Sequence, residues 1–255
     1  MVNILRSEKA KNHTYEMEER FHKQIVTAIN LTKTYVPNHQ FHVKTNICEK
    51  SKICVYDKDS VTAILTCQNP SKKMAVLNFA SYKNPGGMFY QGSIAQEEAL
   101  CHESFLYNVL KEYDDTYYKW NREHLNRALY LNRALYTPNV IFERGESAVK
   151  CDVLTCAAPN YGTYRRYNSD KELNSYYHRD RIRYLLSVAA DNNVNTLILG
   201  AFGCGVFKQD PEQTALFFEE MLISEFENVF DIVVFAIPDK DSKNYKAFEK
   251  VFNYK

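Results

Sequence analysis

Two adjacent carboxylates, Glu97 and Glu98, could do chemistry because glycine-rich segments accompany them in this chain. Only eight glycines occur in 255 residues, and most of them fall in two windows, 86–92 and 200–205. Each window follows an apolar run and precedes a helix-start signal, which is where open α/β sheets bind ligands and where backbone N–H groups hold phosphate. Two such loops predict a diphosphate held from both sides. The alternative is a pair of tight strand-to-helix turns.

Residue types and spacing also argue against other chemistries. Gly86-Gly87-Met88 does not make a G-x-G-x-x-G motif, and residues 200–205 lack the lysine of a P-loop, so NTP hydrolysis is not expected. Neighbouring helical residues diverge by about 100°, so Glu97 and Glu98 cannot straddle a sugar ring as glycosidase carboxylates do. One could reach a scissile bond while the other holds a hydroxyl. Their simpler role is to complement the helix dipole.

Composition places the chain among globular proteins, with 45% apolar and 25% charged residues. The formal net charge of +1 creates no overall attraction to nucleic acid or to an anionic membrane. No apolar run approaches the roughly 18 residues of a membrane span, and the N-terminus carries charges where a signal peptide is apolar. We therefore expect a soluble intracellular protein, with cytoplasm and nucleus not distinguished. The seven cysteines and seven histidines lack metal-binding spacing, which predicts reduced core thiols and no metal.

Short apolar runs that alternate with helical patterns predict the fold. Buried strands are expected at 74–80, 151–157, 196–199 and 231–237, which indicates an α/β sandwich with a mostly parallel or mixed sheet. Before them, apolar residues at helical intervals predict a helical N-terminal extension over 1–45, followed by a main domain over 46–255.

Two helix starts carry capping signals. Ser93 precedes Gln96 with the spacing of a capping box, and Asp210-Pro211 precedes Gln213 in the same way. Both predicted helices begin just after a glycine window, so we expect the windows to meet helix N-termini.

Two further segments have more than one explanation. The hexapeptide Leu125–Tyr130 is repeated unchanged as residues 131–136, which indicates either a local duplication that lengthens a surface helix or an artefact. Tyr164-Arg165-Arg166-Tyr167, with Arg179, Arg181 and Arg183 beyond it, could bind a polyanion through charge and stacking. Such a run is also typical of a solvated helix face and loop.

The combination of several motifs resembles the microbial-type poly(ADP-ribose) glycohydrolases, which are macrodomain proteins. The motifs that carry the resemblance are Asn84-Pro85-Gly86-Gly87, Gln96-Glu97-Glu98-Ala99-Leu100-Cys101, Gly203-Cys204-Gly205-Val206-Phe207 and Val233-Val234-Phe235-Ala236-Ile237. It covers about residues 50–255 in the family's order. It implies a three-layer α/β/α macrodomain with a mixed, mostly parallel sheet and an N-terminal helical extension.

The resemblance also implies a role for each site residue. Glu98 would be the catalytic acid that protonates the leaving ribose oxygen, and Glu97 would hold ribose hydroxyls. To act as an acid at neutral pH, Glu98 must carry a proton, which an enclosed site or the substrate's diphosphate would favour. The remaining substrate-binding residues would be Gln96, Asn78 near the terminal ribose, Gly86, Gly87 and Met88 on one side of the diphosphate, Gly203, Cys204, Gly205 and Val206 on the other, and Phe207 on the ribose.

The expected activity is cleavage of ribose–ribose O-glycosidic bonds with release of ADP-ribose and without a cofactor. Partners would be ADP-ribose or poly(ADP-ribose) chains on modified proteins, with no membrane, and with nucleic acid only as an ADP-ribosylated target. Two alternatives stay open: a non-catalytic ADP-ribose-binding macrodomain and a mono-ADP-ribosyl hydrolase. Met88 stands where the family has a third glycine, and a positive φ there would cost about 1 kcal/mol and reduce catalytic competence.

Overall fold

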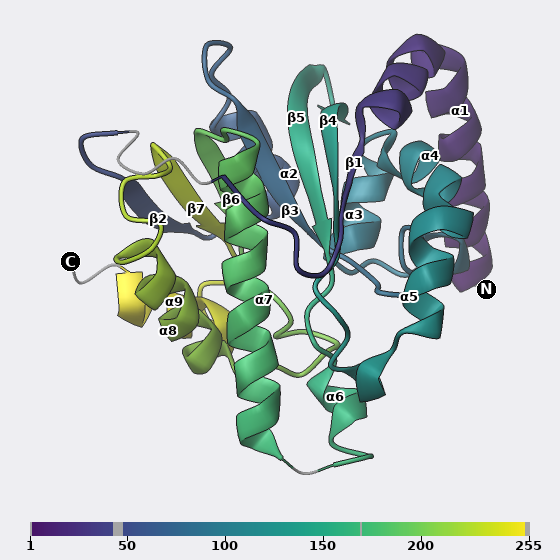
Figure 1. Ribbon diagram of the computed structural model, residues 1–255. Coiled ribbons are helices and arrows are strands. Elements are labelled where there is room, and N and C mark those ends of the chain that lie inside the picture. Colours follow the sequence, from purple (N-terminus) through teal and green to yellow (C-terminus); the bar gives the residue numbers. More distant parts are fainter. Residues whose placement is uncertain (1, 43–47, 169, 253–255) are drawn as a thin grey trace.

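One mixed sheet organises the molecule, and the computed structural model describes it over residues 2–42, 48–168 and 170–252 (Figure 1). The strand order is β1-β4-β5-β3-β6-β7-β2. The strands β5, β3, β6, β7 and β2 are parallel to one another. Strand β4 is antiparallel to both of its neighbours, β1 and β5. The strands are β1 (Lys33–Tyr35), β2 (Lys52–Tyr56), β3 (Met74–Phe79), β4 (Ala134–Arg144), β5 (Ser147–Cys156), β6 (Thr196–Leu199) and β7 (Ile232–Ala236).

Helices cover both faces of this sheet, so the predicted three-layer α/β/α arrangement is confirmed (Figure 1). Residues of α7, α8 and α9 form one core with the sheet, and residues of α1 to α4 form the other. The helices are α1 (Val2–Leu31), α2 (Ser60–Thr66), α3 (Gln96–His102), α4 (Leu106–Leu110), α5 (Lys119–Glu123), α6 (Tyr161–Tyr164), α7 (Lys171–Asp191), α8 (Pro211–Leu222) and α9 (Lys243–Phe252), with short turns at η1 (Phe89–Gln91), η2 (Lys111–Tyr113), η3 (Asp114–Tyr118) and η4 (Asn126–Ala128).

Apolar side chains point to both faces of the central strands, which explains why helices cover both faces of the sheet. In β3, Ala75 and Leu77 pack into the core under α7 and α8, while Met74 and Val76 pack into the core under α1 and α4. Successive side chains of a strand point to opposite faces, so a strand buried on both sides reads as a continuous apolar run. The four predicted strands all occur in the sheet, which confirms their assignment as buried strands.

The N-terminal segment is built into this architecture. Helix α1 covers only residues 2–31 of the predicted helical extension. Residues 33–35 form β1 instead, because they pair with β4 at the edge of the sheet, with Thr34 opposite Leu135. The predicted domain boundary between residues 45 and 46 lies in 43–47, outside the described residues, so the division stays a prediction. In the described part of the chain, no helix has the length and apolar character needed to cross a membrane.

The two helix-start predictions had different outcomes. The Asp210 carboxylate accepts the Gln213 N–H at 2.9 Å and caps α8, as predicted. The Ser93 prediction was wrong, because α3 begins at Gln96 without any side-chain cap. At Ser93 the chain is still closing the η1 turn, since its N–H donates to the Met88 carbonyl at 3.2 Å.

The repeated hexapeptide has two different structures, so a lengthened surface helix is the wrong explanation. The first copy forms the η4 turn, with positive φ angles at Asn126, Arg127, Ala128 and Tyr130. The second copy enters β4 at Ala134, where β1 and β5 pair with it on both sides. Strand pairing therefore decides the conformation of the second copy, while the first copy pairs with none of the described strands.

Candidate active site

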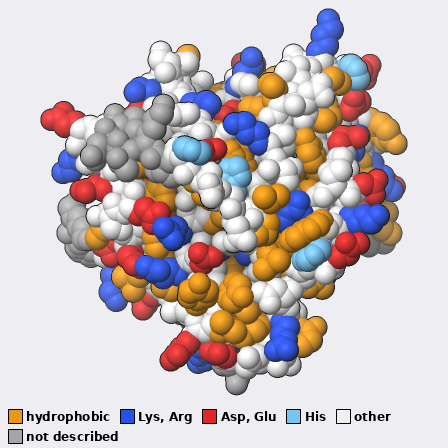
Figure 2. Space-filling view, in the orientation of Figure 1, with side chains coloured by type: hydrophobic (Ala, Val, Ile, Leu, Met, Phe, Trp, Pro, Cys, Tyr) orange, Lys and Arg blue, Asp and Glu red, His pale blue; other side chains and the backbone are white. Residues whose placement is uncertain are grey.

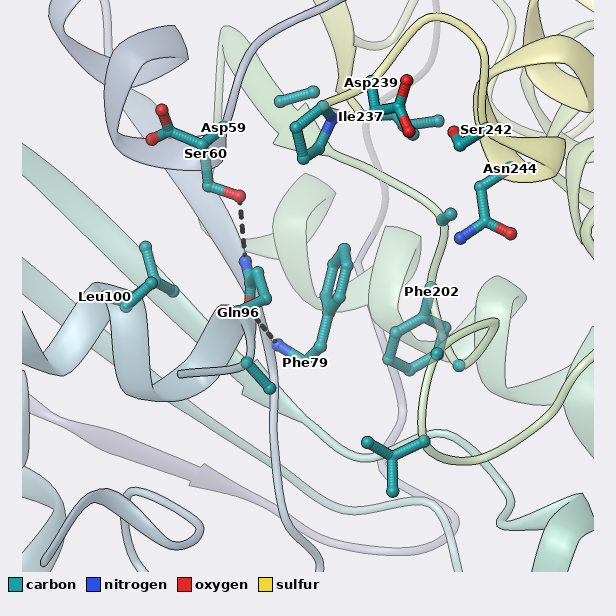
Figure 3. Close-up of a pocket in the computed structure, with 18 of the residues that line it drawn as sticks. Asp59, Ser60, Phe79, Gln96, Leu100, Phe202, Ile237, Asp239, Ser242 and Asn244 are labelled. Carbon is teal, nitrogen blue, oxygen red and sulfur yellow. Dashed lines mark hydrogen bonds between the residues drawn. The ribbon is translucent and has the colours of Figure 1, made fainter. Parts of the chain in front are cut away.

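Helix α3 is fixed at the carboxyl end of β3 by the side chain of Gln96. Its Oε1 accepts the Phe79 N–H at 2.9 Å, and its Nε2 donates to the Leu77 carbonyl at 2.8 Å and to Ser60 Oγ at 3.1 Å (Figure 3). These contacts join α3 to β3 and to the start of α2. Gln96 was predicted to bind substrate, and here its amide is used to position the two residues that follow it.

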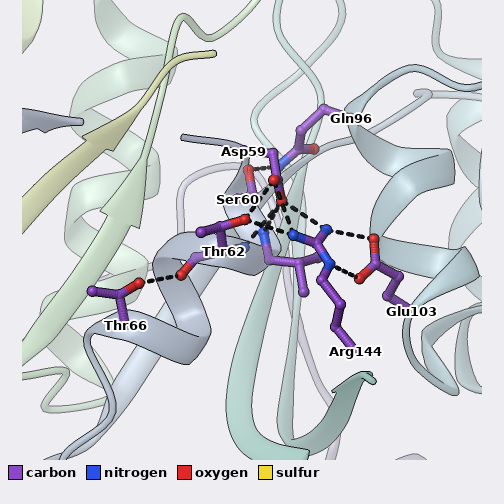
Figure 4. A network of polar contacts seen from close by, with 8 residues as sticks. Asp59, Ser60, Thr62, Thr66, Gln96, Glu103 and Arg144 are labelled. Carbon is purple, nitrogen blue, oxygen red and sulfur yellow. Dashed lines mark hydrogen bonds and ion pairs between the residues drawn. The ribbon is translucent and has the colours of Figure 1, made fainter. Parts of the chain in front are cut away.

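A second contact holds the far end of the same helix. The guanidinium of Arg144 on β4 binds Glu103, just after α3, and Asp59, which caps α2 (Figure 4). Burial alone would raise the pKa of Asp59, but hydrogen bonds from Arg144 and Thr62 outweigh it and leave that pKa well below its usual value. The ion pairs of Arg144 therefore hold the start of α2 and the end of α3 in place relative to each other.

Glu97 is only 3% exposed, and the protein itself occupies both of its oxygens. Oε2 accepts the Ser81 N–H at 2.7 Å, and Oε1 accepts from Asn78 Nδ2 at 3.2 Å. Burial raises the pKa of Glu97 to about 8; the hydrogen bonds from Ser81 and Asn78 oppose that rise, and the charge of Glu98 adds to it. Glu97 therefore retains a proton near neutral pH.

Glu98 differs from its neighbour in having a free oxygen. It is 5% exposed, and its Oε1 accepts the Met88 N–H at 2.8 Å. Its Oε2 is buried and has no hydrogen-bond partner among the residues that the structure describes. Buried polar atoms are nearly always hydrogen-bonded, so this atom lacks a partner that a substrate could supply.

Both carboxylates converge on the first glycine loop, residues 84–92. Gly86 and Gly87 have φ angles of 64° and 62°, in the left-handed region that favours glycine. A Cβ on Gly87 would lie 2.5 Å from Glu98 Oε1 and 2.8 Å from Glu97 Oε2. Position 87 therefore requires glycine, both for its backbone angle and for the space that the two carboxylates occupy.

The expected backbone strain at Met88 is absent. Its φ angle is −113°, which any L-residue adopts, and its side chain is 54% exposed. The left-handed angles that the loop needs lie at the two preceding glycines. The prediction that methionine costs about 1 kcal/mol of backbone strain here was wrong, because a cost of that size applies only at positive φ.

The second glycine loop, residues 200–207, offers free backbone donors. Within the described chain, the N–H groups of Gly203, Gly205, Val206 and Phe207 donate to no protein acceptor. The Cys204 N–H is taken by the Ala201 carbonyl at 3.1 Å, and burial raises the pKa of the Cys204 thiol to about 12. This loop can therefore bind an anion through its backbone, and its thiol stays protonated.

A cavity of about 460 Å³ extends from the second loop to the end of β7 (Figure 3). The Phe79 and Phe202 rings meet edge-to-face at 5.8 Å beside it. Five of the predicted site residues line this cavity: Gln96, Gly203, Gly205, Val206 and Phe207. The remaining ones do not line it: Asn78, Gly86, Gly87, Met88, Glu97, Glu98 and Cys204.

The sequence reasoning missed the polar residues at the far end of this cavity. Asp59 follows β2, while Asp239, Ser242 and Asn244 follow β7. Ligands of parallel sheets bind beyond the carboxyl ends of the strands, and this rule would have indicated these positions.

Aromatic side chains connect the carboxylates to the end of the second loop. Ser81, which binds Glu97, is followed by Tyr82, whose ring stacks on Tyr130 at 4.1 Å. Tyr130 in turn meets Phe207 edge-to-face at 6.3 Å. Two ring contacts thus link Phe207 to the segment whose Ser81 binds Glu97. Among the described residues, no group of histidine, cysteine and acidic side chains could hold a metal ion.

Comparison with known proteins agrees with this arrangement. The family model "Microbial-type PARG, catalytic domain" matches residues 2–145. The solved poly(ADP-ribose) glycohydrolase of Thermomonospora curvata is 29% identical to this chain, with a TM-score of 0.85 over 97% of this chain and 99% of that one. Its complex with the inhibitor ADP-HPD is 30% identical, with a TM-score of 0.83 over the same shares.

A second bacterial enzyme is also similar. Poly(ADP-ribose) glycohydrolase of Deinococcus radiodurans in complex with ADP-ribose is 29% identical, with a TM-score of 0.80 over 90% of this chain and 97% of that one. No curated protein matches this chain. Since the family model spans more than half of the 255 residues, the chain belongs to the microbial-type poly(ADP-ribose) glycohydrolases.

Proposed function

We propose that this glycohydrolase cleaves the ribose–ribose O-glycosidic bond of poly(ADP-ribose) and releases ADP-ribose, with Glu98 as the acid. The observation that carries the assignment is Glu98 Oε2, the buried carboxylate oxygen without a protein partner. Glu97 has no such atom, because Ser81 and Asn78 occupy both of its oxygens.

The two loops suggest how substrate lies in the site. The free N–H groups of the second loop would hold the diphosphate, and the cavity beside Phe202 and Ile237 has the size and apolar walls to take an adenosine. The terminal ribose would then lie between the carboxylates and Phe207. ADP-ribose bound to a solved relative makes it the natural ligand to test.

The reaction follows from this placement. Glu98 gives its proton to the leaving ribose oxygen as the bond from that oxygen to C1″ breaks, which leaves an oxocarbenium-like ribose. Water then attacks C1″, and its proton returns to the Glu98 carboxylate. The half-buried Cys204 thiol stays protonated, so it does not serve as a nucleophile. The substrate's own diphosphate can orient the water.

The test is incubation of the full chain with labelled poly(ADP-ribose) and, separately, with a mono-ADP-ribosylated protein, followed by separation of the products. Release of ADP-ribose from the polymer is the expected result. Release from the mono-modified protein alone would favour the mono-ADP-ribosyl hydrolase. Binding of polymer without any release would favour the non-catalytic module, for which the unstrained backbone of Met88 offers no support.

A further inference from the structure

An exposed basic surface lies next to the second glycine loop and has no role in the site described so far. It consists of Arg127, Arg165, Arg166 and Lys208, with the 68% exposed ring of Tyr167 beside them, and we name it the basic rim. In Figure 2, basic and hydrophobic side chains lie over α6, whereas acidic ones gather over the start of α7. The rim is therefore a local positive surface on a protein whose net charge is only +1.

Backbone contacts hold three separate segments together in this rim. The Gly162 N–H donates to the Phe207 carbonyl at 3.0 Å, which joins α6 to the second loop. The Asn160 N–H donates to the Ala128 carbonyl at 2.8 Å, which joins the same helix to the first copy of the repeat. The left-handed turn of that copy places Arg127 on the surface. The repeat thus contributes one of the rim's charges.

The charges of the rim are available to a ligand. Other arginines of the same stretch are occupied, since Arg179 pairs with Glu220, Arg183 pairs with Glu225, and Arg181 is fully buried. By contrast, none of the four basic side chains of the rim makes an ion pair or a side-chain hydrogen bond within the described chain. Asp170, the acidic residue that follows this stretch in sequence, accepts the Leu173 N–H and caps α7. Clustered like charges without a counter-charge favour binding of an anion.

The position of the rim indicates which anion it binds. The second loop runs from the cavity, at Gly203 and Gly205, to Phe207 and Lys208 against α6. At this end of the loop, Phe207 meets Tyr130, which stacks on Tyr82, the neighbour of the Glu97-binding Ser81. If adenosine occupies the cavity and the reacting ribose lies by Glu98, the rest of the polymer leaves on the side of the rim.

We propose that the basic rim binds the diphosphate of the next ADP-ribose unit of the chain, with Tyr167 available to stack on its adenine. This inference rests on the proposed function, and it adds a subsite for the part of the substrate that leaves. Arginine forms charge-assisted, bidentate hydrogen bonds with phosphate, and exposed aromatic rings stack on bases. A single ADP-ribose held by the second loop would leave Arg165 and Arg166 unused, whereas a second linked unit would engage them.

The test compares ligands of one and two units on a full chain that carries Glu98→Gln, so that the longer ligand stays intact. We expect the two-unit oligomer of poly(ADP-ribose) to bind about tenfold more tightly than ADP-ribose at low salt, and raised salt to remove most of that gain. The double substitution Arg165→Ser and Arg166→Ser should abolish the gain and leave the affinity for ADP-ribose unchanged. The control variant Lys11→Ser with Lys23→Ser removes two exposed charges from α1 instead. It should preserve the gain in affinity for the two-unit oligomer.

Three results would contradict the proposal in distinct ways. Equal affinity for one and two units, or a gain that survives the double substitution, would overturn the rim alone. A single-stranded oligonucleotide with the same number of phosphates that binds as tightly as the two-unit oligomer would assign the rim to nucleic acid instead. Failure of the parent protein to bind ADP-ribose would overturn the proposed function and the rim together.

Discussion

The two glycine loops of this protein look alike in sequence but are built for different tasks. In the first loop the two amides nearest the carboxylates are already used, since the Gly87 N–H donates to the Asn84 carbonyl and the Met88 N–H donates to Glu98. In the second loop the amides of Gly203, Gly205, Val206 and Phe207 have no acceptor within the described chain. The first loop therefore positions the Glu98 carboxylate, and the second loop is free to bind the diphosphate. Glycine-rich sequence alone does not distinguish a phosphate-binding loop from one that packs against catalytic side chains.

The largest effect is expected where the first loop meets the acid. Glu98→Gln should lower turnover of poly(ADP-ribose) by about 10²–10⁴, because the amide cannot deliver a proton. The affinity for ADP-ribose should stay within a few fold of that of the wild type. Initial rates and ligand titration measure the two effects. The exposed Glu146→Gln, on the β4–β5 turn, is the matched control and should behave as wild type. Full turnover in Glu98→Gln would remove this residue as the acid.

A pair of alanine substitutions contrasts the loops directly. Gly87→Ala adds a methyl group 2.5 Å from Glu98 Oε1 at a φ of +62°, so turnover should fall at least tenfold and the free energy of unfolding by about 1–2 kcal/mol. Gly205→Ala adds a methyl group with nothing within 4 Å, so kcat should stay unchanged. Rates and denaturant unfolding of both variants provide the measurement. Equal losses in the two variants would contradict the division between the loops.

The buried Glu97 makes the stability of the fold depend on pH. Burial raises the pKa of Glu97 in the folded state to about 8, so folding favours its protonated form. The stability gained in this way is complete below the unfolded pKa of 4.5 and is lost as pH rises towards 8, by at most about 1.4 kcal/mol per pH unit. Thermal unfolding between pH 5 and 8.5 should show this decline, and Glu97→Gln should flatten it. A parallel decline in both proteins would place its origin elsewhere.

The smallest effect is expected at Met88. Its N–H, not its side chain, contacts Glu98, so Met88→Gly should leave turnover within about twofold. The free energy of unfolding should fall by about 0.4–1 kcal/mol, because glycine gives the unfolded chain more freedom. Steady-state kinetics and denaturant unfolding test this expectation. Higher activity in Met88→Gly would mean that the methionine obstructs the substrate.

The fold could be predicted further than the site. Strands buried on both faces appear as continuous apolar runs, so β3, β5, β6 and β7 could all be assigned from the sequence. The cap of α8 could also be predicted, because Asp210, proline and glutamine stand in their required order. Such local signals act within a few residues and survive in the folded structure.

Contacts between distant segments could not be predicted in this way. The two copies of Leu-Asn-Arg-Ala-Leu-Tyr have one sequence and two conformations, because only the second lies between two strands. The orientation of Glu97 depends on Asn78 and Ser81, which lie 19 and 16 residues away. Asp59 and Asp239 line one cavity only because β2 and β7 are neighbours in the sheet.

The most direct test of this division follows the backbone amides during titration with ADP-ribose. In the ¹⁵N-labelled protein, the amide resonances of Gly203, Gly205 and Val206 should shift strongly and gain protection from hydrogen exchange, because the diphosphate supplies the acceptors that they lack. The amides of Gly87 and Met88, which already donate to the protein, should change little. The reverse pattern, with strong shifts at Gly87 and Met88 and none at Gly203 to Val206, would contradict the account.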